Sequence, residues 1–183
     1  MTTRDEYLKQ PVDARLARLA RTADDLAAAI RSHDDTTLSR RPEPKAWSAK
    51  EVVCHLRDIE ELCVLRYHAM LSMDEPRMFV VGLAAKDPAA FGIIGGAPYP
   101  LDAERWAEER QYLRNDTVAA LDAFRRRRGE ALGLLRALTP EQWRRGGLVP
   151  TGARVSFGEL VAGSAAHDDT HLAQLARALD GRP

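Results

Sequence analysis

The chain of 183 residues carries 27 basic and 27 acidic side chains, so its formal net charge is zero. This balance argues against a general nucleic-acid binder, which needs a surplus of positive charge. With 45% hydrophobic and 30% charged residues, the composition excludes a disordered chain and suits one globular domain, expected to span residues 1–183.

The first long helix is predicted from about Asp13 to His33. Apolar side chains recur there every three or four residues, the spacing that places them on one face of a helix. They are Leu16, Leu19, Ala23, Leu26 and Ile30. Residues 34–47 contain Pro42 and Pro44 and are predicted to form a loop.

A second helix is predicted over residues 49–72, because Ser48 and Glu51 have the spacing of a capping box. Residues 74–101, with four prolines and four glycines, are predicted to form a long loop. A connection of this length is often functional, as a lid or a pocket wall, and short helical turns within it are the alternative.

The C-terminal half is predicted to contain two further long helices. Residues 102–112 form a short helix, and a third long helix covers 116–138. Residues 139–141 begin another turn, since proline suits the first position of a helix. A second capping box, Ser156 with Glu159, starts the last long helix, which ends just before a glycine.

These elements predict an all-α fold class. Four long helices joined mostly by short links favour an antiparallel four-helix bundle, with extra short helices and the long loop at 74–101. Apart from a short extended piece expected within 148–155, no segment shows the alternation of a β-strand.

Two of the five histidines, His167 and His171, lie four residues apart on the last predicted helix. At that spacing the Cβ atoms are about 5–6 Å apart, so both imidazoles can reach one metal ion. A helical wheel places the pair at the edge of an apolar stripe that includes Leu160 and Leu175. Two buried imidazoles without partners are costly, and a shared cation removes that cost.

His55 on the second predicted helix has a similar setting. Ile59 and Cys63 lie on the same side of that helix, so this face can meet the histidine face of the last helix. The alternative for a single interior histidine is a hydrogen-bonded core residue. That interpretation is preferred for His33 and His68, which show no such pattern.

The segment from His167 to His171 also invites comparison with the metalloprotease motif HExxH, with Asp168 in the position of the glutamate. The comparison is disfavoured, because only twelve residues follow to supply a third ligand. Asp168 falls inside the apolar stripe and therefore needs a partner. It either orients a metal ligand or pairs with a core arginine, and the salt bridge is the preferred interpretation.

The motifs together resemble those of the DinB/YfiT-like superfamily of metal-binding four-helix bundles. They are Trp47-Ser48, His55-Leu56-Arg57-Asp58, the segment 124–135, Trp143, Gly152, Ser156-Phe157-Gly158-Glu159-Leu160, His167, His171 and Gln174. The resemblance covers about residues 14–179. It implies that His55, His167 and His171 bind a divalent metal, zinc or nickel. Metal-bound imidazoles usually donate their second nitrogen to a carboxylate or carbonyl, so Asp58 and Glu51, each one turn from His55, are candidates for that role, and the alternative for both is a solvated helix face.

Three protein ligands leave open coordination positions, as in catalytic metal sites. The family includes metal-dependent hydrolases, thiol S-transferases that use bacillithiol or mycothiol, and a mycothiol-dependent isomerase. The resemblance therefore implies an enzyme for a small-molecule substrate, with a low-molecular-weight thiol as cofactor in the transferase case. Arg66, Arg105 and Arg128 are candidates to bind such a thiol, while Asp58 and Asp168 are candidates for supporting roles. The alternative is a non-enzymatic, stress-linked metal-binding or interaction module.

The expected location is cytoplasmic. Cys54 and Cys63 match no CxxC pattern, and residues 1–10 lack the apolar stretch of a signal peptide. No run of about 18 apolar residues is present to span a membrane. The arginine run 125–128 is not backed by positive net charge, so no nucleic-acid partner is expected. The family often dimerises, which makes a homodimer one of the assemblies to expect.

Overall fold

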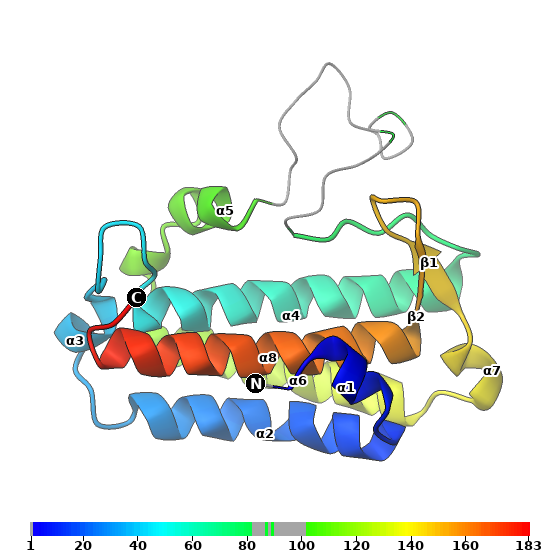
Figure 1. Ribbon diagram of the computed structural model, residues 1–183, viewed down its shortest axis with the longest axis horizontal. Coiled ribbons are helices and arrows are strands. Elements are labelled where there is room, and N and C mark those ends of the chain that lie inside the picture. The colour runs from blue at the N-terminus through cyan, green and yellow to red at the C-terminus, as the bar shows by residue number, and fades with distance from the viewer. Residues whose placement is uncertain (1, 82–86, 88, 90–101) are drawn as a thin grey trace.

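The computed structural model describes residues 2–81, 87, 89 and 102–183. Four long helices lie side by side in one bundle (Figure 1). They are α2 (Val12–Ile30), α4 (Ala49–Ser72), α6 (Thr117–Arg136) and α8 (Phe157–Leu179). The predicted all-α four-helix bundle is therefore confirmed. No helix of the described residues is both long and apolar enough to cross a membrane.

The connections give each long helix one parallel and one antiparallel neighbour. Both α2 and α4 pack against α6 and α8, so α2 and α4 lie on a diagonal of the bundle. The antiparallel packing expected from short links holds for α4 with α8 and for α2 with α6 (Figure 1). By contrast, α4 and α6 run the same way, because the long connection between them returns the chain to the end where α4 began.

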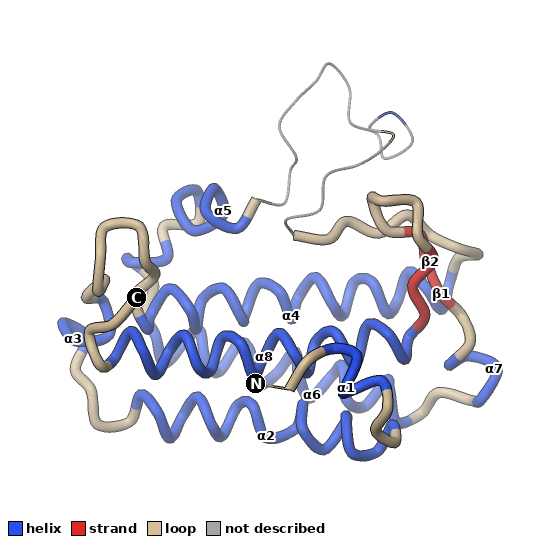
Figure 2. The backbone as a smooth tube through the Cα atoms, viewed as in Figure 1, coloured by secondary structure: helices blue, strands red, loops and turns tan. Residues whose placement is uncertain are grey.

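Short helices lie both at the ends of the bundle and along its sides (Figure 2). They are α1 (Arg4–Leu8), α3 (Asp35–Ser39), α5 (Ala103–Glu109), the 3-10 helix η2 (Tyr112–Arg114) and α7 (Pro140–Trp143). The predicted helix at 102–112 and the turn at 139–141 are confirmed. The loop predicted at 34–47 is wrong in its first part, and α1 was not predicted. Helices of five residues are too short for apolar periodicity to detect, although the caps Thr3 and Asp34 were visible.

A two-stranded antiparallel hairpin precedes α8. Its strands are β1 (Gly146–Leu148) and β2 (Arg154–Ser156). The extended piece expected within 148–155 overlaps only the end of β1 and the start of β2, because residues 149–153 form the turn between them. Gly147 lies so close to the chain at Pro76 that an added Cβ would be 2.6 Å from the Pro76 carbonyl oxygen. The hairpin thereby holds the start of the segment 74–101, most of which lies outside the described residues.

Both predicted capping boxes are present. The Ser48 hydroxyl accepts the Glu51 N–H, and the Glu51 carboxylate accepts the Ser48 N–H at 2.9 Å. Ser156 and Glu159 make the same reciprocal pair. Because these boxes set where α4 and α8 begin, they also set which faces of the two helices meet.

The core is divided into two apolar clusters. One contains Tyr67 and Phe157, and the other contains Leu26 and Phe124. Each long helix contributes residues to both clusters, and polar side chains occupy the positions in between. These are Thr22, Asp58, Glu60, Arg128 and Asp168, together with His55. A polar layer therefore crosses the middle of the bundle, and the candidate site lies in it.

Candidate metal centre

Three histidines converge where α4 faces α8. One nitrogen from each of His55, His167 and His171 lies within 4.8 Å of the others. The Nε2 atoms of His55 and His167 are 3.3 Å apart. Antiparallel packing brings them together, because a residue near the start of α4 then faces the C-terminal half of α8. His68 is exposed and contacts Glu130 at 3.5 Å, and His33 is half-buried at the end of α2, so neither joins the cluster.

Burial keeps these imidazoles neutral. Burial, together with the charges of the neighbouring histidines, lowers the pKa of His55 to about 2. Burial and then His171 lower the pKa of His167 to about 3. The pKa of His171 is lowered by burial as well. Neutral imidazole is the form that binds a metal, because one ring nitrogen keeps its lone pair.

The donor set fits a divalent cation. Nitrogens bound to one tetrahedral zinc at about 2.0–2.1 Å are about 3.3–3.4 Å from each other. The Nε2 atoms of His55 and His167 already have that separation, 3.3 Å. The Nδ1 atom of His171 donates to the Gln174 side-chain oxygen at 2.7 Å, which leaves Nε2 of His171 free to accept. Imidazole ligands suit zinc, copper, iron and nickel.

Trp47 closes one side of the cluster. Its ring centroid is 4.8 Å from that of His55 and 6.3 Å from that of His171, with the Trp47 and His171 rings nearly parallel. The indole N–H donates to Glu104 at 3.2 Å, which ties the tryptophan to α5. These contacts limit the rotation of the two imidazoles.

A buried group of charges lies next to the histidines. Arg128 contacts Asp168 and Glu60, each at 2.7 Å, and all three side chains are at most 5% exposed. The Thr22 hydroxyl donates to Asp168 at 2.6 Å. Burial disfavours the charge on Asp168, but Arg128 outweighs it and holds the pKa of Asp168 low. The preferred interpretation of Asp168, a salt bridge with a core arginine, is confirmed.

The carboxylates expected to support His55 have other partners. Asp58 accepts the Tyr112 hydroxyl at 2.7 Å and pairs with Arg57 at 2.8 Å. Glu51 is occupied by its capping box and by Arg41. Among the described residues, Nδ1 of His55 has no hydrogen-bond partner. The expectation that Asp58 or Glu51 holds His55 is therefore wrong. A spacing of one helical turn does not ensure that a carboxylate points at the imidazole, and both carboxylates here point to other partners.

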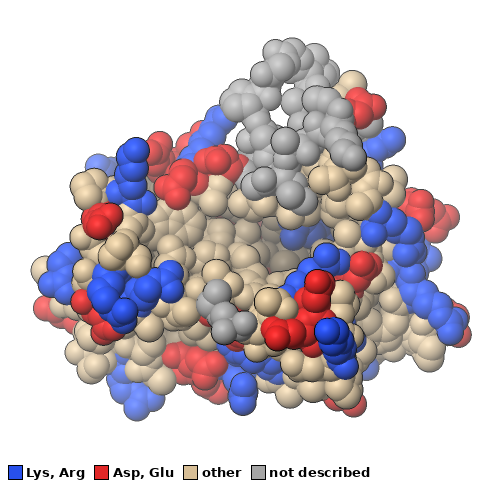
Figure 3. All heavy atoms as spheres, viewed as in Figure 1, with Lys and Arg blue, Asp and Glu red and all other residues tan. Residues whose placement is uncertain are grey.

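The histidines form one part of the wall of a cavity of about 670 Å³. Apolar side chains from three parts of the chain line much of the remainder, among them Leu56, Ile59, Val149, Val155 and Leu160. In Figure 3 the surface is hollowed near the middle of the face shown, with basic side chains at the edge of the hollow. The site is therefore open to a small molecule and is not closed around the imidazoles.

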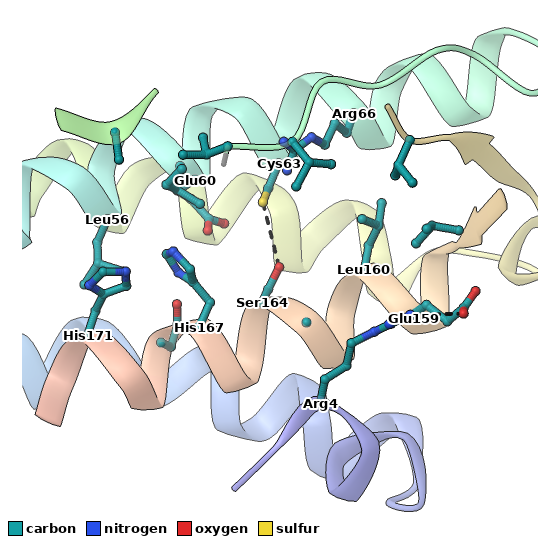
Figure 4. Close-up of a pocket in the computed structure, with 18 of the residues that line it drawn as sticks. Arg4, Leu56, Glu60, Cys63, Arg66, Glu159, Leu160, Ser164, His167 and His171 are labelled. Carbon is teal, nitrogen blue, oxygen red and sulfur yellow. Dashed lines mark hydrogen bonds and ion pairs between the residues drawn. The ribbon is translucent and has the colours of Figure 1, made fainter. Parts of the chain in front are cut away.

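Sequence reasoning missed two side chains on the cavity wall. Glu60 and Ser164 both line it, and Ser164 lies 3.8 Å from the Cys63 sulfur (Figure 4). The helical wheel that selected the histidines could have found them as well. Glu60 precedes Cys63 by one turn and Ser164 precedes His167 by one turn, so each lies near the selected face of its helix. Burial raises the pKa of Glu60, and Arg128 offsets only part of that effect.

The three candidate arginines differ in whether they line the cavity and in whether an acidic side chain pairs with them. Arg66 lines the cavity, and Arg128 lines it but is matched by two acids. Arg105 pairs with Glu109 at 2.6 Å on the surface of α5 and is not among the residues that line the cavity.

The chain was compared with curated proteins, with solved structures and with models of protein families. A comparison with curated proteins finds no match. The structure of YfiT from Bacillus subtilis, a probable metal-dependent hydrolase with an unusual four-helix bundle topology, is similar, with a TM-score of 0.74 and 22% identity. That match covers 91% of this chain and 84% of YfiT.

A mycothiol-dependent maleylpyruvate isomerase is also similar, with a TM-score of 0.63 and 13% identity over 96% of this chain. This chain corresponds to only 63% of that protein. At such identities the two structures establish the fold. The model of the DinB superfamily matches residues 18–175. These residues include α4 and α6 entirely, most of α2 and α8, and all three clustered histidines, so the chain belongs to the DinB superfamily.

Proposed function

We propose that this protein is a metal-dependent enzyme, a hydrolase or a thiol S-transferase, with His55, His167 and His171 as metal ligands. The observation that carries the proposal is the placement of three neutral imidazoles on the wall of a cavity of about 670 Å³. A structural site is closed by its protein ligands, whereas a catalytic site leaves a position for substrate. The three-histidine cluster beside an open cavity supports a catalytic site.

The residues of this chain have distinct parts in such a site. Burial keeps the ligand imidazoles unprotonated, and Gln174 holds His171 so that Nε2 faces His55 and His167. The apolar wall around Ile59 and Leu160 excludes water from the substrate. A divalent cation held there supplies Lewis-acid chemistry, which polarises a carbonyl or makes water or a thiol more nucleophilic.

The comparisons support both reaction types. YfiT is described as a probable metal-dependent hydrolase, and the isomerase depends on mycothiol, so water and a thiol are each a candidate nucleophile here. Three imidazoles are ligands suited to zinc and nickel, and these are the metals that we propose.

Metal content is the first measurement. We expect one zinc or nickel per chain in the purified protein, and less than a tenth of that in His171→Ala, because two imidazoles rarely hold a divalent ion alone. His68→Ala is the matched control, since His68 is exposed on α4 and outside the cluster. Full metal content in His171→Ala would rule out the assigned ligand set.

Activity is the second measurement. The metal-loaded chain is tested for hydrolysis of esters and amides and for conjugation of electrophiles with bacillithiol or mycothiol. Turnover that chelation removes and zinc restores supports the enzyme. A metal-replete chain without turnover on the whole panel would favour the non-enzymatic module.

A further inference from the structure

Arg66 is a charged group of the cavity wall that the proposed metal chemistry does not use. It lies on α4 three turns beyond His55, and only 9% of its surface is exposed. Figure 4 shows it on the same helix as Cys63, facing the cavity. Its Nε donates to the Phe79 carbonyl oxygen at 2.8 Å, and its Nη2 donates to the same oxygen. A neutral carbonyl leaves the guanidinium charge uncompensated.

The chain supplies no acid to Arg66. No carboxylate of the described residues forms an ion pair with it, and the remaining residues, 1, 82–86, 88 and 90–101, include no aspartate or glutamate. The other cavity arginines differ. Arg128 is matched by two acids, Arg4 pairs with Glu159 at 3.1 Å, and Arg154 pairs with Glu75 at 2.9 Å.

A buried charge without a partner is unfavourable, and a bound anion removes that cost. The Arg66 charge also reaches into the cavity. Arg66 lies one turn beyond Cys63 on α4, and both side chains line the cavity. An anion bound at Arg66 would therefore lie inside the cavity and near the thiol.

The wall between Arg66 and the histidines is mostly apolar, and Glu60, Cys63 and Ser164 add a few polar atoms to it. Ile59 lies between His55 and Arg66 on α4, and Leu160 lies opposite on α8. The Cα atoms of His55 and Arg66 are about 16 Å apart along the helix. Long side chains on a helix lean toward its N-terminus, so the guanidinium lies nearer the histidines than the Arg66 Cα does. A ligand that reaches both ends therefore spans less than this distance but is still extended.

We propose that Arg66 binds the carboxylate of an elongated, otherwise apolar ligand whose opposite end lies at the three histidines. One unmatched positive charge suits one negative charge, which favours a carboxylate over a phosphate monoester with nearly two. The carboxylate subsite stands on Arg66 alone, whereas the position of the reactive end rests on the proposed metal-dependent function.

The test uses hexanoate and hexanamide, which have the same length and nearly the same shape but differ in charge. Their dissociation constants are measured by NMR titration of the full chain, both after removal of metal with EDTA and after loading with zinc. The wild type is expected to bind hexanoate more tightly than hexanamide on the order of tenfold or more in both states, because hydrogen bonds to charged groups exceed neutral ones.

Three variants identify the source of that preference. Arg66→Met keeps the apolar stem and is expected to abolish the preference, while Arg66→Lys keeps the charge and part of the preference. Arg154→Met removes another arginine of the cavity wall, one that Glu75 already matches, and is expected to leave the preference unchanged.

Several results would overturn the proposal. A preference that persists in Arg66→Met, or an equal loss of both ligands, would mean that Arg66 only holds the Phe79 backbone. A preference seen only with zinc would mean that the metal binds the carboxylate, and absence of hexanoate binding would rule out the subsite. Because the metal-free measurement needs no turnover, its outcome is independent of whether the chain proves to be an enzyme.

Discussion

Two polar clusters lie next to each other in the interior of the bundle, and they differ in how their polar groups are satisfied. In the ion-pair cluster, Arg128 is matched by Glu60 and Asp168, and Thr22 adds a hydrogen bond. In the histidine cluster, three neutral bases face one another with two Nε2 atoms only 3.3 Å apart. The charges of the first cluster are matched by the chain itself, whereas the second cluster is the one for which we propose a cation.

This difference indicates what each cluster contributes. The ion pairs join α4, α6 and α8 at the level of the histidines, so they fix the distance between the two helices that carry His55 and His167. The histidine cluster gains from a ligand that the fold does not supply. We expect substitutions in the first cluster to change folding and substitutions in the second to change metal binding.

The largest effect is expected from Arg128→Met. Both Glu60 and Asp168 would then be buried without a counter-charge, and removing one partner of a buried pair costs about 3–5 kcal/mol of unfolding free energy. Urea denaturation of the metal-free chain measures it. Arg127→Met is the matched control, since Arg127 is partly exposed and contacts Glu61 at 3.1 Å, where such pairs contribute about 0–1 kcal/mol. Equal losses in the two variants would mean that the buried pairs do not matter for folding.

A smaller effect is expected when zinc is added to the metal-free wild type. Zinc at a hundred times its dissociation constant adds about 2.7 kcal/mol of stability, provided that it does not bind the unfolded chain. For a domain of this size that corresponds to roughly 5–10 °C in Tm. His55→Ala should lose the zinc-dependent shift and His68→Ala should keep it, as followed by thermal denaturation. A shift retained in His55→Ala would contradict the assignment of that ligand.

The smallest effect is expected from Gln174→Ala, which removes the acceptor for Nδ1 of His171 but no ligand. Loss of such a support typically weakens metal affinity about 10–100-fold, through a less fixed imidazole. Competition with a zinc chelator measures the affinity. Thr170→Ala is the control on the same helix, because Thr170 is exposed and its hydroxyl donates to the Ala166 carbonyl. Equal affinities in these two variants would mean that Gln174 does not orient His171.

Much of the fold was determined by local sequence. Apolar periodicity predicted α2, and the serine–glutamate boxes predicted the starts of α4 and α8, since both signals act within a few residues. The same period predicted that His167 and His171 share a face. The choice of His55 as third member needed the wheel together with the family resemblance, and the structure brings all three together.

Only the tertiary structure decided which distant groups meet. The parallel course of α4 and α6 places Arg128 beside Glu60, although Arg128 had been a candidate to bind a thiol cofactor. Asp58, one turn from His55, is drawn instead to Tyr112 of η2. The sequence likewise could not predict that Arg66 has no acidic partner, because the compensation of a charge depends on all of its neighbours in space. Local sequence therefore determined where the helices form and which of their faces are apolar, while packing between remote segments determined which polar groups are satisfied and which are left for a ligand.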